Sequence, residues 1–189
     1  MIKYFTIENF LTNIECDNVT EYSIKNLKLR KALMANDLLN EKVRKSKVAF
    51  TDFNGEFSFI KKRLNEEINK VMKLKGYEIE FEKEPFQFTT YETGEFYNWH
   101  KDASEVASSE RYCSIVIQLN DEYHGGDLEM VIPKSDSKEI LKFKKGKGNL
   151  FVFLSSITHR VAEVTDGTRY SLVSWFSIKP INNFKKTLI

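Results

Sequence analysis

The chain has 189 residues, of which 41% are hydrophobic and 13% aromatic, so it is long and apolar enough for one domain with a sizeable core. Its 29 basic and 27 acidic side chains leave a net charge of +2, a balance that provides no reason to expect a nucleic acid or a membrane surface as partner. Two cysteines, an opening segment unlike a signal peptide and the lack of any apolar run of roughly 18 residues favour a soluble, cytoplasmic protein without a disulfide framework.

The first part of the chain is typical of a short strand followed by helices. Residues 2 to 8 are compatible with a strand, and Thr12 followed by Glu15 forms a capping-box pattern that predicts a helix from about Asn13. A second helix is predicted in FSFIKKRLNEEINKVMKLKG, which Gly76 can end. Its apolar residues recur at helical spacing on one face: Ile60, Leu64, Ile68, Val71 and Met72. Residues 28 to 55 show no regular pattern, and we expect a lid or a substrate wall there.

After residue 80, short β-rich runs alternate with turn signals. The runs are EPFQFTTY, RYCSIVIQLN, GGDLEMVIP, KEILKF, NLFVFL and RYSLVSWFSI. This pattern predicts a mostly β fold, either an all-β sandwich or a jelly roll (a cupin-like double-stranded β-helix), with the N-terminal helices packed on one side. We expect a single domain over residues 1–189, with a helical support region over residues 1–80 and the jelly-roll core over residues 81–180.

A histidine and an aspartate stand two residues apart in the segment NWHKDAS. His100 and Asp102 would point to the same side of an extended chain, so an imidazole and a carboxylate could reach one metal ion. A pair of this kind also arises by chance, and alone it more often belongs to an ordinary polar turn than to a metal site. A metal site therefore needs a third ligand from elsewhere in the chain.

The third ligand has two candidates, because the chain has three histidines. His124 precedes a glycine pair and is typical of an exposed turn, whereas His159 follows the strongly apolar run NLFVFL and is favoured as the inward-facing residue. Two histidines and one carboxylate form the facial triad of non-haem Fe(II) oxygenases, which leaves positions open for a cosubstrate and O₂. Zinc is the competing metal, although structural zinc sites usually have four protein ligands, often cysteines.

An oxygenase that uses 2-oxoglutarate needs a cation for the distal carboxylate of this diacid. Arg169 opens the predicted strand RYSLVSWF and can form two parallel hydrogen bonds with a carboxylate. On this strand Arg169, Ser171, Val173 and Trp175 would share one face, while the residues between them would share the other. For an isolated arginine, a position beside a surface turn would be the simpler interpretation.

Three segments of the sequence together resemble one family. YETGEFYNWHKD is similar to the Y-x-x-G-x-x-Y-x-x-H-x-D segment of Fe(II)/2-oxoglutarate-dependent oxygenases of the prolyl 4-hydroxylase superfamily, and GGDLEM is similar to the strand that follows it. GNLFVFLSSITHRVAEVTDGTRYSLVSWF resembles the family's C-terminal block, in particular that of the bacterial PKHD-type hydroxylases. The resemblance is strong over residues 86 to 178 and faint before them.

The resemblance assigns roles to individual residues. It implies iron ligation by His100, Asp102 and His159, with Arg169 bound to the distal carboxylate of 2-oxoglutarate. It implies that Tyr91 forms a hydrogen bond with the same cosubstrate. The resemblance further implies substrate-pocket positions for three residues, of which Gln118 stands where some prolyl hydroxylases have a tyrosine: Tyr97, Gln118 and Trp175.

The activity implied by the resemblance is hydroxylation of an unactivated C–H bond, with Fe(II) as cofactor, 2-oxoglutarate and O₂ as cosubstrates and ascorbate as reductant. A prolyl residue in a peptide or protein is the leading substrate. A free amino acid or another small molecule is the alternative substrate, because a fold does not determine its substrate. An alternative of another class is a catalytically silent jelly-roll binding module, which would have no need for the three ligands and Arg169.

Overall fold

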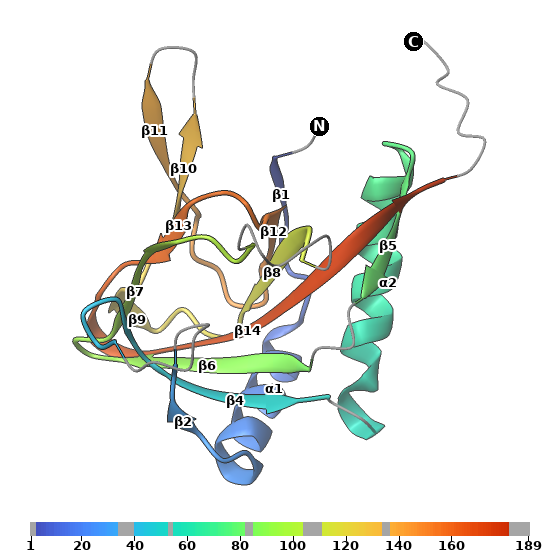
Figure 1. The fold of residues 1–189 in the computed structure, drawn as a ribbon. Helices are drawn as coiled ribbons and strands as arrows, with labels where there is room; N and C mark the ends of the chain where they lie inside the picture. The colour runs from blue at the N-terminus through green and yellow to red at the C-terminus, as the bar shows by residue number, and fades with distance from the viewer. Residues whose placement is uncertain are drawn as a thin grey trace.

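Two antiparallel β-sheets make up most of the protein in a computed structural model, which describes residues 3–33, 40–52, 55–81, 85–103, 111–133 and 137–181 (Figure 1). Apolar side chains of both sheets meet in one buried cluster, with Val116 and Phe151 from the large sheet and Met130 and Val161 from the small one. The predicted jelly roll, mostly β with helices on one side, is therefore confirmed.

The large sheet has the strand order β1-β12-β8-β14-β6-β4-β2, and the long strand β14 also pairs with β5 and β9. β14 therefore links several parts of the sheet, and a single strand carries Arg169 and Trp175 through the middle of the fold. The strand bounds are β1 Tyr4–Ile7, β2 Arg30–Lys31, β4 Lys47–Thr51, β5 Tyr77–Phe81, β6 Phe86–Glu92, β8 Cys113–Gln118, β9 Tyr123–Gly125, β12 Leu150–Leu154 and β14 Val164–Pro180.

The small sheet has the order β11-β10-β13-β7-β3 and carries His100 and His159. Its strands are β3 Arg44–Lys45, β7 Phe96–His100, β10 Leu128–Pro133, β11 Lys138–Lys142 and β13 His159–Val161. Gly94 in the turn between β6 and β7 has a φ of 78°, in the left-handed region that favours glycine. The turn closes with a hydrogen bond from the Glu95 amide to the Glu92 carbonyl and directs the chain from the large sheet into the small one.

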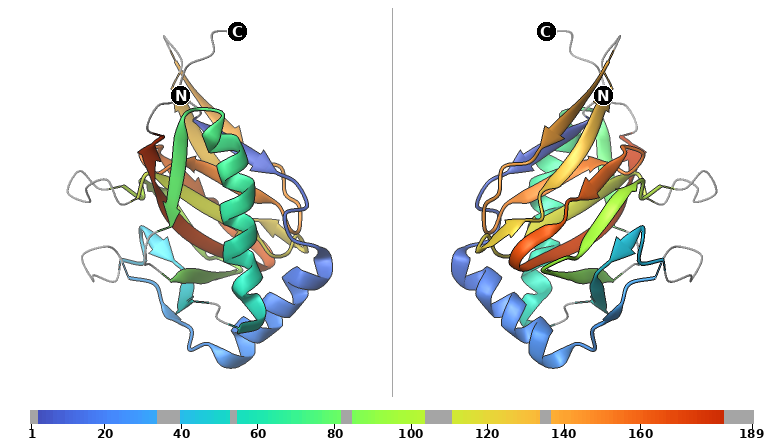
Figure 2. Two further views of the ribbon diagram at one scale, coloured as in Figure 1. Left: turned by 90° about the vertical axis from the view of Figure 1, so that its right-hand side faces the viewer. Right: turned by 90° about the vertical axis from the view of Figure 1, so that its left-hand side faces the viewer.

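Two helices cover the outer face of the large sheet, with α2 lying across that sheet in the left view of Figure 2. α1 (Asn13–Asn26) begins at Thr12, whose side chain and that of Glu15 form both hydrogen bonds of the predicted capping box. A short 3-10 turn, η1 (Gly55–Phe57), leads into α2 (Ser58–Lys73), which buries Ile60, Leu64, Ile68 and Met72. These side chains pack with Ile115 and Ile117 of β8, so β8 is buried on both of its faces.

Strands also occur before residue 80, where β1 pairs with β12 and β4 pairs with β6. The segment from 28 to 55, for which we expect a lid or a substrate wall, contributes β2, β3 and β4 through its described residues. Residues 34–39 and 53–54 of this segment lie outside the described residues. Within the described ranges, no helix is long and apolar enough to cross a membrane.

Glu15 connects the two helices and gives a prediction about stability. Its carboxylate accepts hydrogen bonds from both terminal nitrogens of Arg63, each at 2.8 Å, and from the Thr12 amide at 2.9 Å. The hydrogen bond from Arg63 is the largest cause that lowers the pKa of Glu15 from 4.5 to about 2. A carboxyl with a lowered pKa stabilises the fold above its unfolded pKa, and this contribution is lost as the pH falls through the folded pKa.

We therefore expect Glu15→Gln to lower the free energy of unfolding by about 1 kcal/mol at pH 7, a modest value because both partners are partly exposed. The difference from the wild type should fade as the pH decreases from 4.5 to about 2. Urea denaturation across this range measures it, with Glu67→Gln, from an exposed pair with Lys70, as control. A difference that is independent of pH would contradict the assigned role.

Candidate metal centre

The structure brings His100, Asp102 and His159 together. His100 ends β7 and His159 begins β13, and these neighbouring strands place the two histidines opposite each other in the sheet register. Asp102 follows β7, and its backbone amide donates to the Ser155 carbonyl at 3.0 Å. One potential ligand atom from each of the three side chains lies within 4.8 Å of the other two. His124 lies apart from this cluster, exposed on β9.

The two imidazoles are oriented by backbone carbonyls. His100 Nδ1 lies 2.7 Å from the Asn98 carbonyl oxygen, and His159 Nδ1 lies 2.9 Å from that of Ile157. Because a carbonyl only accepts, each Nδ1 is the protonated nitrogen, and Nε2 keeps its lone pair for a metal. The two Nε2 atoms lie 3.5 and 3.6 Å from oxygens of Asp102. Ligands bound at about 2.1 Å and at right angles would be about 3 Å apart, so this spacing fits one ion.

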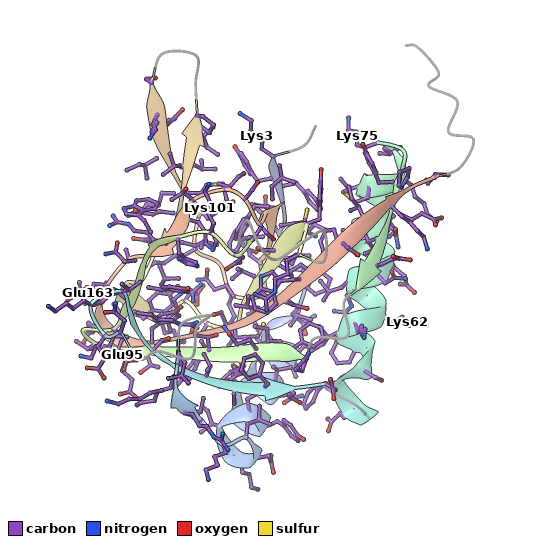
Figure 3. The ribbon with its side chains drawn as sticks, in the orientation of Figure 1. Lys3, Lys62, Lys75, Glu95, Lys101 and Glu163 are labelled. Carbon is purple, nitrogen blue, oxygen red and sulfur yellow. The ribbon has the colours of Figure 1, made fainter. Side chains whose placement is uncertain are left out.

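Lys101 lies between His100 and Asp102 in the sequence, but its side chain does not lie between theirs. Its side chain is exposed, whereas His100 and Asp102 are both largely buried. Figure 3 labels Lys101 beside the end of β7. The alternation of side chains in an extended segment therefore directs residues 100 and 102 to one side and Lys101 to solvent.

Two side chains from the large sheet fix the carboxylate of Asp102. Ser114 on β8 donates to Asp102 Oδ2 at 2.6 Å, and the indole Nε1 of Trp175 on β14 donates to the same oxygen at 3.0 Å. Ser114 is in turn hydrogen-bonded to Ser155 at 2.8 Å. Both donors occupy one oxygen, so the other oxygen, Oδ1, remains directed at His100.

The charge state of these groups suits metal binding. Burial alone would raise the pKa of Asp102, but nearby His159 and His100, together with the hydrogen bond from Ser114, outweigh this effect and hold the pKa well below its usual range. Burial lowers the pKa of His159. An ionised carboxylate and a neutral imidazole are the forms that bind a metal, so these two shifts favour the metal-binding forms of Asp102 and His159.

Arg169 is a cation inside the fold, with an exposed fraction of 1%. Its Nη1 donates to Ser171 at 2.9 Å, whereas Nε and Nη2 have no hydrogen-bond partner among the described residues. Tyr91 lies opposite Arg169 in the pairing of β6 with β14, and the guanidinium carbon lies 5.5 Å from the centre of its ring. Because unpaired buried donors are costly, this guanidinium fits a bound carboxylate. The residues present thus fit both Fe(II) and 2-oxoglutarate.

Gln118 and Tyr123 lie near this arginine. The Gln118 amide donates to the Tyr123 hydroxyl at 2.9 Å, and burial raises the pKa of Tyr123 while nearby Arg169 opposes that rise. Tyr123 was not among the site residues expected from the sequence. Alternation along β9 is the signal for it, because the exposed His124 leaves Tyr123 facing inward.

The two aromatic residues expected at the substrate pocket lie on either side of the triad. Tyr97 stacks on His100, with a distance of 3.4 Å between the ring centres and an angle of 13° between the planes. The indole Nε1 of Trp175 donates a hydrogen bond to Asp102 at 3.0 Å. Tyr97 therefore packs against the proposed ligand His100, and Trp175 is hydrogen-bonded to the proposed ligand Asp102.

Comparison with known proteins points to one family. Residues 86–177 match the sequence model of the family described as the 2OG-Fe(II) oxygenase superfamily. A PKHD-type hydroxylase of Rippkaea orientalis is 37% identical over 93 residues, which are 47% of this chain and 40% of that protein. A second PKHD-type hydroxylase, from Prochlorococcus marinus, is 32% identical over 104 residues, covering 53% and 45% of the two chains. The chain spans less than half the length of these relatives.

Solved structures of prolyl hydroxylases share the fold. A prolyl hydroxylase from Trichoplax adhaerens, in complex with a peptide fragment of the hypoxia inducible factor oxygen degradation domain, has a TM-score of 0.73 at 19% identity, covering 93% of this chain and 83% of that one. A Pseudomonas putida prolyl-4-hydroxylase has a TM-score of 0.69 at 21% identity, with 93% and 92% covered.

The hydrogen bond from Trp175 gives a prediction about metal affinity. Trp175→Phe removes the indole donor to Asp102 but keeps an aromatic ring, so we expect the affinity for Mn(II) or Fe(II) to fall about tenfold or more. Anaerobic equilibrium titration measures this affinity. Trp99→Phe is the matched control, because Trp99 packs against Arg160 instead of Asp102. Equal metal affinities of Trp175→Phe and the wild type would show that this hydrogen bond does not hold the ligand.

Proposed function

Because the chain belongs to the 2OG-Fe(II) oxygenase superfamily, we propose that it is a 2-oxoglutarate-dependent dioxygenase that hydroxylates an unactivated C–H bond. His100, Asp102 and His159 would hold Fe(II), in a facial arrangement that leaves sites open for cosubstrate and O₂. The observation that carries the proposal is the combination of this triad with the fully buried, partly unpaired Arg169 on β14.

Arg169 would bind the distal carboxylate of 2-oxoglutarate. The free Nε and Nη2 donors suit a two-point contact with a carboxylate, and Tyr91 opposite Arg169 offers a hydroxyl to the same ligand. Without Arg169, the bound carboxylate of the cosubstrate would be a buried charge without a partner. Arg169 therefore contributes to the choice of cosubstrate as well as to its affinity.

When bound, Fe(II) supplies the chemistry that couples oxidative decarboxylation of 2-oxoglutarate to C–H hydroxylation, and we expect ascorbate to keep it reduced. The chain's own residues orient the reactants and exclude water. Ser114 and Trp175 fix the ionised Asp102. Phe153, which belongs to the apolar cluster with Phe151 and Val161, packs against His159 with 4.7 Å between the ring centres. An aromatic and aliphatic interior of this kind protects a reactive oxidant from side reactions with solvent.

We propose a prolyl residue in a peptide or protein as the substrate. The PKHD-type relatives support a hydroxylase, and the prolyl hydroxylases of similar fold support a prolyl target. Tyr97, which stacks on His100, is the residue that we propose as one wall of the substrate pocket.

Succinate formation from 2-oxoglutarate, measured with Fe(II), O₂ and proline-containing peptides, tests the ligand set. His159→Ala should abolish turnover, because it removes one of the three proposed ligands. His124→Ala is the matched control and should retain turnover close to the wild type, because His124 is exposed outside the cluster. Full turnover by His159→Ala, or an equal loss in a folded His124→Ala variant, would refute the assignment.

Mass spectrometry of the same peptides tests the substrate. The proposal requires that at least one peptide gains an oxygen atom on proline in step with succinate release. Turnover of 2-oxoglutarate without hydroxylation of any prolyl peptide would reject the prolyl substrate and leave the oxygenase in place.

A further inference from the structure

Arg44 is a second buried arginine near the candidate metal centre. It belongs to β3, the edge strand beside β7, and lies opposite Tyr97 in the pairing of these strands. Only 8% of its surface is exposed, which is unusual for an arginine. Its guanidinium carbon lies 4.5 Å from the centre of the Tyr97 ring.

Tyr97 is enclosed between Arg44 and His100. The His100 ring is 3.4 Å from the Tyr97 ring and nearly parallel to it, so it fills one face of the phenol. The guanidinium, also over the ring, must therefore occupy the other face. This stack positions Arg44 one aromatic ring away from a proposed iron ligand.

Arg44 lacks a carboxylate partner among the described residues. Its Nε donates to the Ser46 hydroxyl at 2.9 Å, which is a neutral contact. Two less buried arginines are paired: Arg63 with Glu15 at 2.8 Å, and Arg160 with Glu129 at 2.8 Å. A buried guanidinium without an anion is costly, so its retention at this position indicates a ligand that supplies the negative charge.

We propose that Arg44 holds a carboxylate of the primary substrate, so that this enzyme selects an anionic substrate. The inference rests on the proposed hydroxylase function and goes beyond it by naming a charge on the substrate. The carboxylate could belong to a peptide, as its C-terminus, or to a free amino acid. Arg44 would act as a specificity residue, with Tyr97 between the anchored carboxylate and the metal centre.

2-Oxoglutarate is a dicarboxylate, so the two buried arginines must be distinguished. Arg169 is the more buried one and lies on β14 with its unpaired donors fully enclosed, as suits a small cosubstrate. Arg44 lies on an edge strand, farther from the middle of the large sheet, as suits a part of the substrate that enters from outside. Arg44→Gln should therefore leave the affinity for 2-oxoglutarate within about twofold, and Arg169→Gln should lower it at least about tenfold.

The test uses matched acids and amides as probes of substrate binding. The full chain, loaded anaerobically with redox-silent Mn(II) and 2-oxoglutarate, is titrated with L-proline and L-prolinamide, and with the peptide acetyl-Ala-Ala-Pro as free acid and as amide. We expect the wild type to bind at least one acid about tenfold to a hundredfold more tightly than its amide, the range of one charge-assisted contact. A larger preference for the acid over the amide with L-proline identifies a free amino acid as the source of the carboxylate. A larger preference with the peptide identifies a peptide C-terminus.

The variants decide whether Arg44 causes this preference. Arg44→Gln should reduce it to about twofold or less, Arg44→Lys should keep part of it, and Lys45→Gln, an exposed neighbour on β3, should keep all of it. The inference is overturned if the wild type prefers no acid, if Arg44→Gln keeps the preference, or if Arg44→Gln loses 2-oxoglutarate binding.

Turnover of the same probes with Fe(II) and O₂ separates this inference from the proposed function. An Arg44-dependent preference for acids, without hydroxylation of any probe, would reject the prolyl substrate and support the carboxylate site. Equal binding and hydroxylation of acids and amides would support the prolyl hydroxylase and overturn the role of Arg44.

Discussion

Hydrogen bonds to Asp102 link the two sheets of this protein at the candidate metal centre. Asp102 follows the last residue of a small-sheet strand, yet the donors to its Oδ2 come from β8 and β14, the central strands of the large sheet. Its backbone amide is tied to Ser155, in the turn before β13. The position of Oδ2 therefore depends on four strands, and the other oxygen, Oδ1, is left to face His100. The low pKa of Asp102 follows from the same arrangement, because His159, His100 and Ser114 favour its charged form more than burial opposes it.

The charges around this carboxylate determine which ligands the interior can accept. Arg169 and Arg44 are both buried, and neither has a carboxylate partner among the described residues. A bound divalent metal would add positive charge, which Asp102 offsets only in part. The environment is therefore suited to anions, one of which is the proposed cosubstrate. Because Arg169 and Arg44 lie at different depths, they would bind the carboxylates of two molecules that differ in size and in route of entry.

Local patterns in the sequence predicted those parts of the molecule that local interactions determine. The capping box of Thr12 and Glu15 and the buried face of α2 follow from spacing along one element. His159, favoured over His124 by its place after an apolar run, lies together with His100 and Asp102. The contact of Trp175 with Asp102 was not predictable, because it depends on the register in which β14 places Trp175 opposite Ser114 of β8. Arg44 was missed for a related reason. Its strand has two residues, too few for a periodic signal, and only the pairing with β7 reveals its position beside Tyr97.

We propose that one Fe(II) and one 2-oxoglutarate bind together at the cluster of His100, Asp102 and His159 beside Arg169. Anaerobic titration with Fe(II) and 2-oxoglutarate, followed by the visible charge-transfer absorption of the iron-bound cosubstrate, measures this directly. We predict a band that saturates at one equivalent of each ligand, and a much higher 2-oxoglutarate concentration for half-saturation in Arg169→Gln. The absence of the band in the folded wild type, or a band unaffected by the loss of Arg169, would contradict the account.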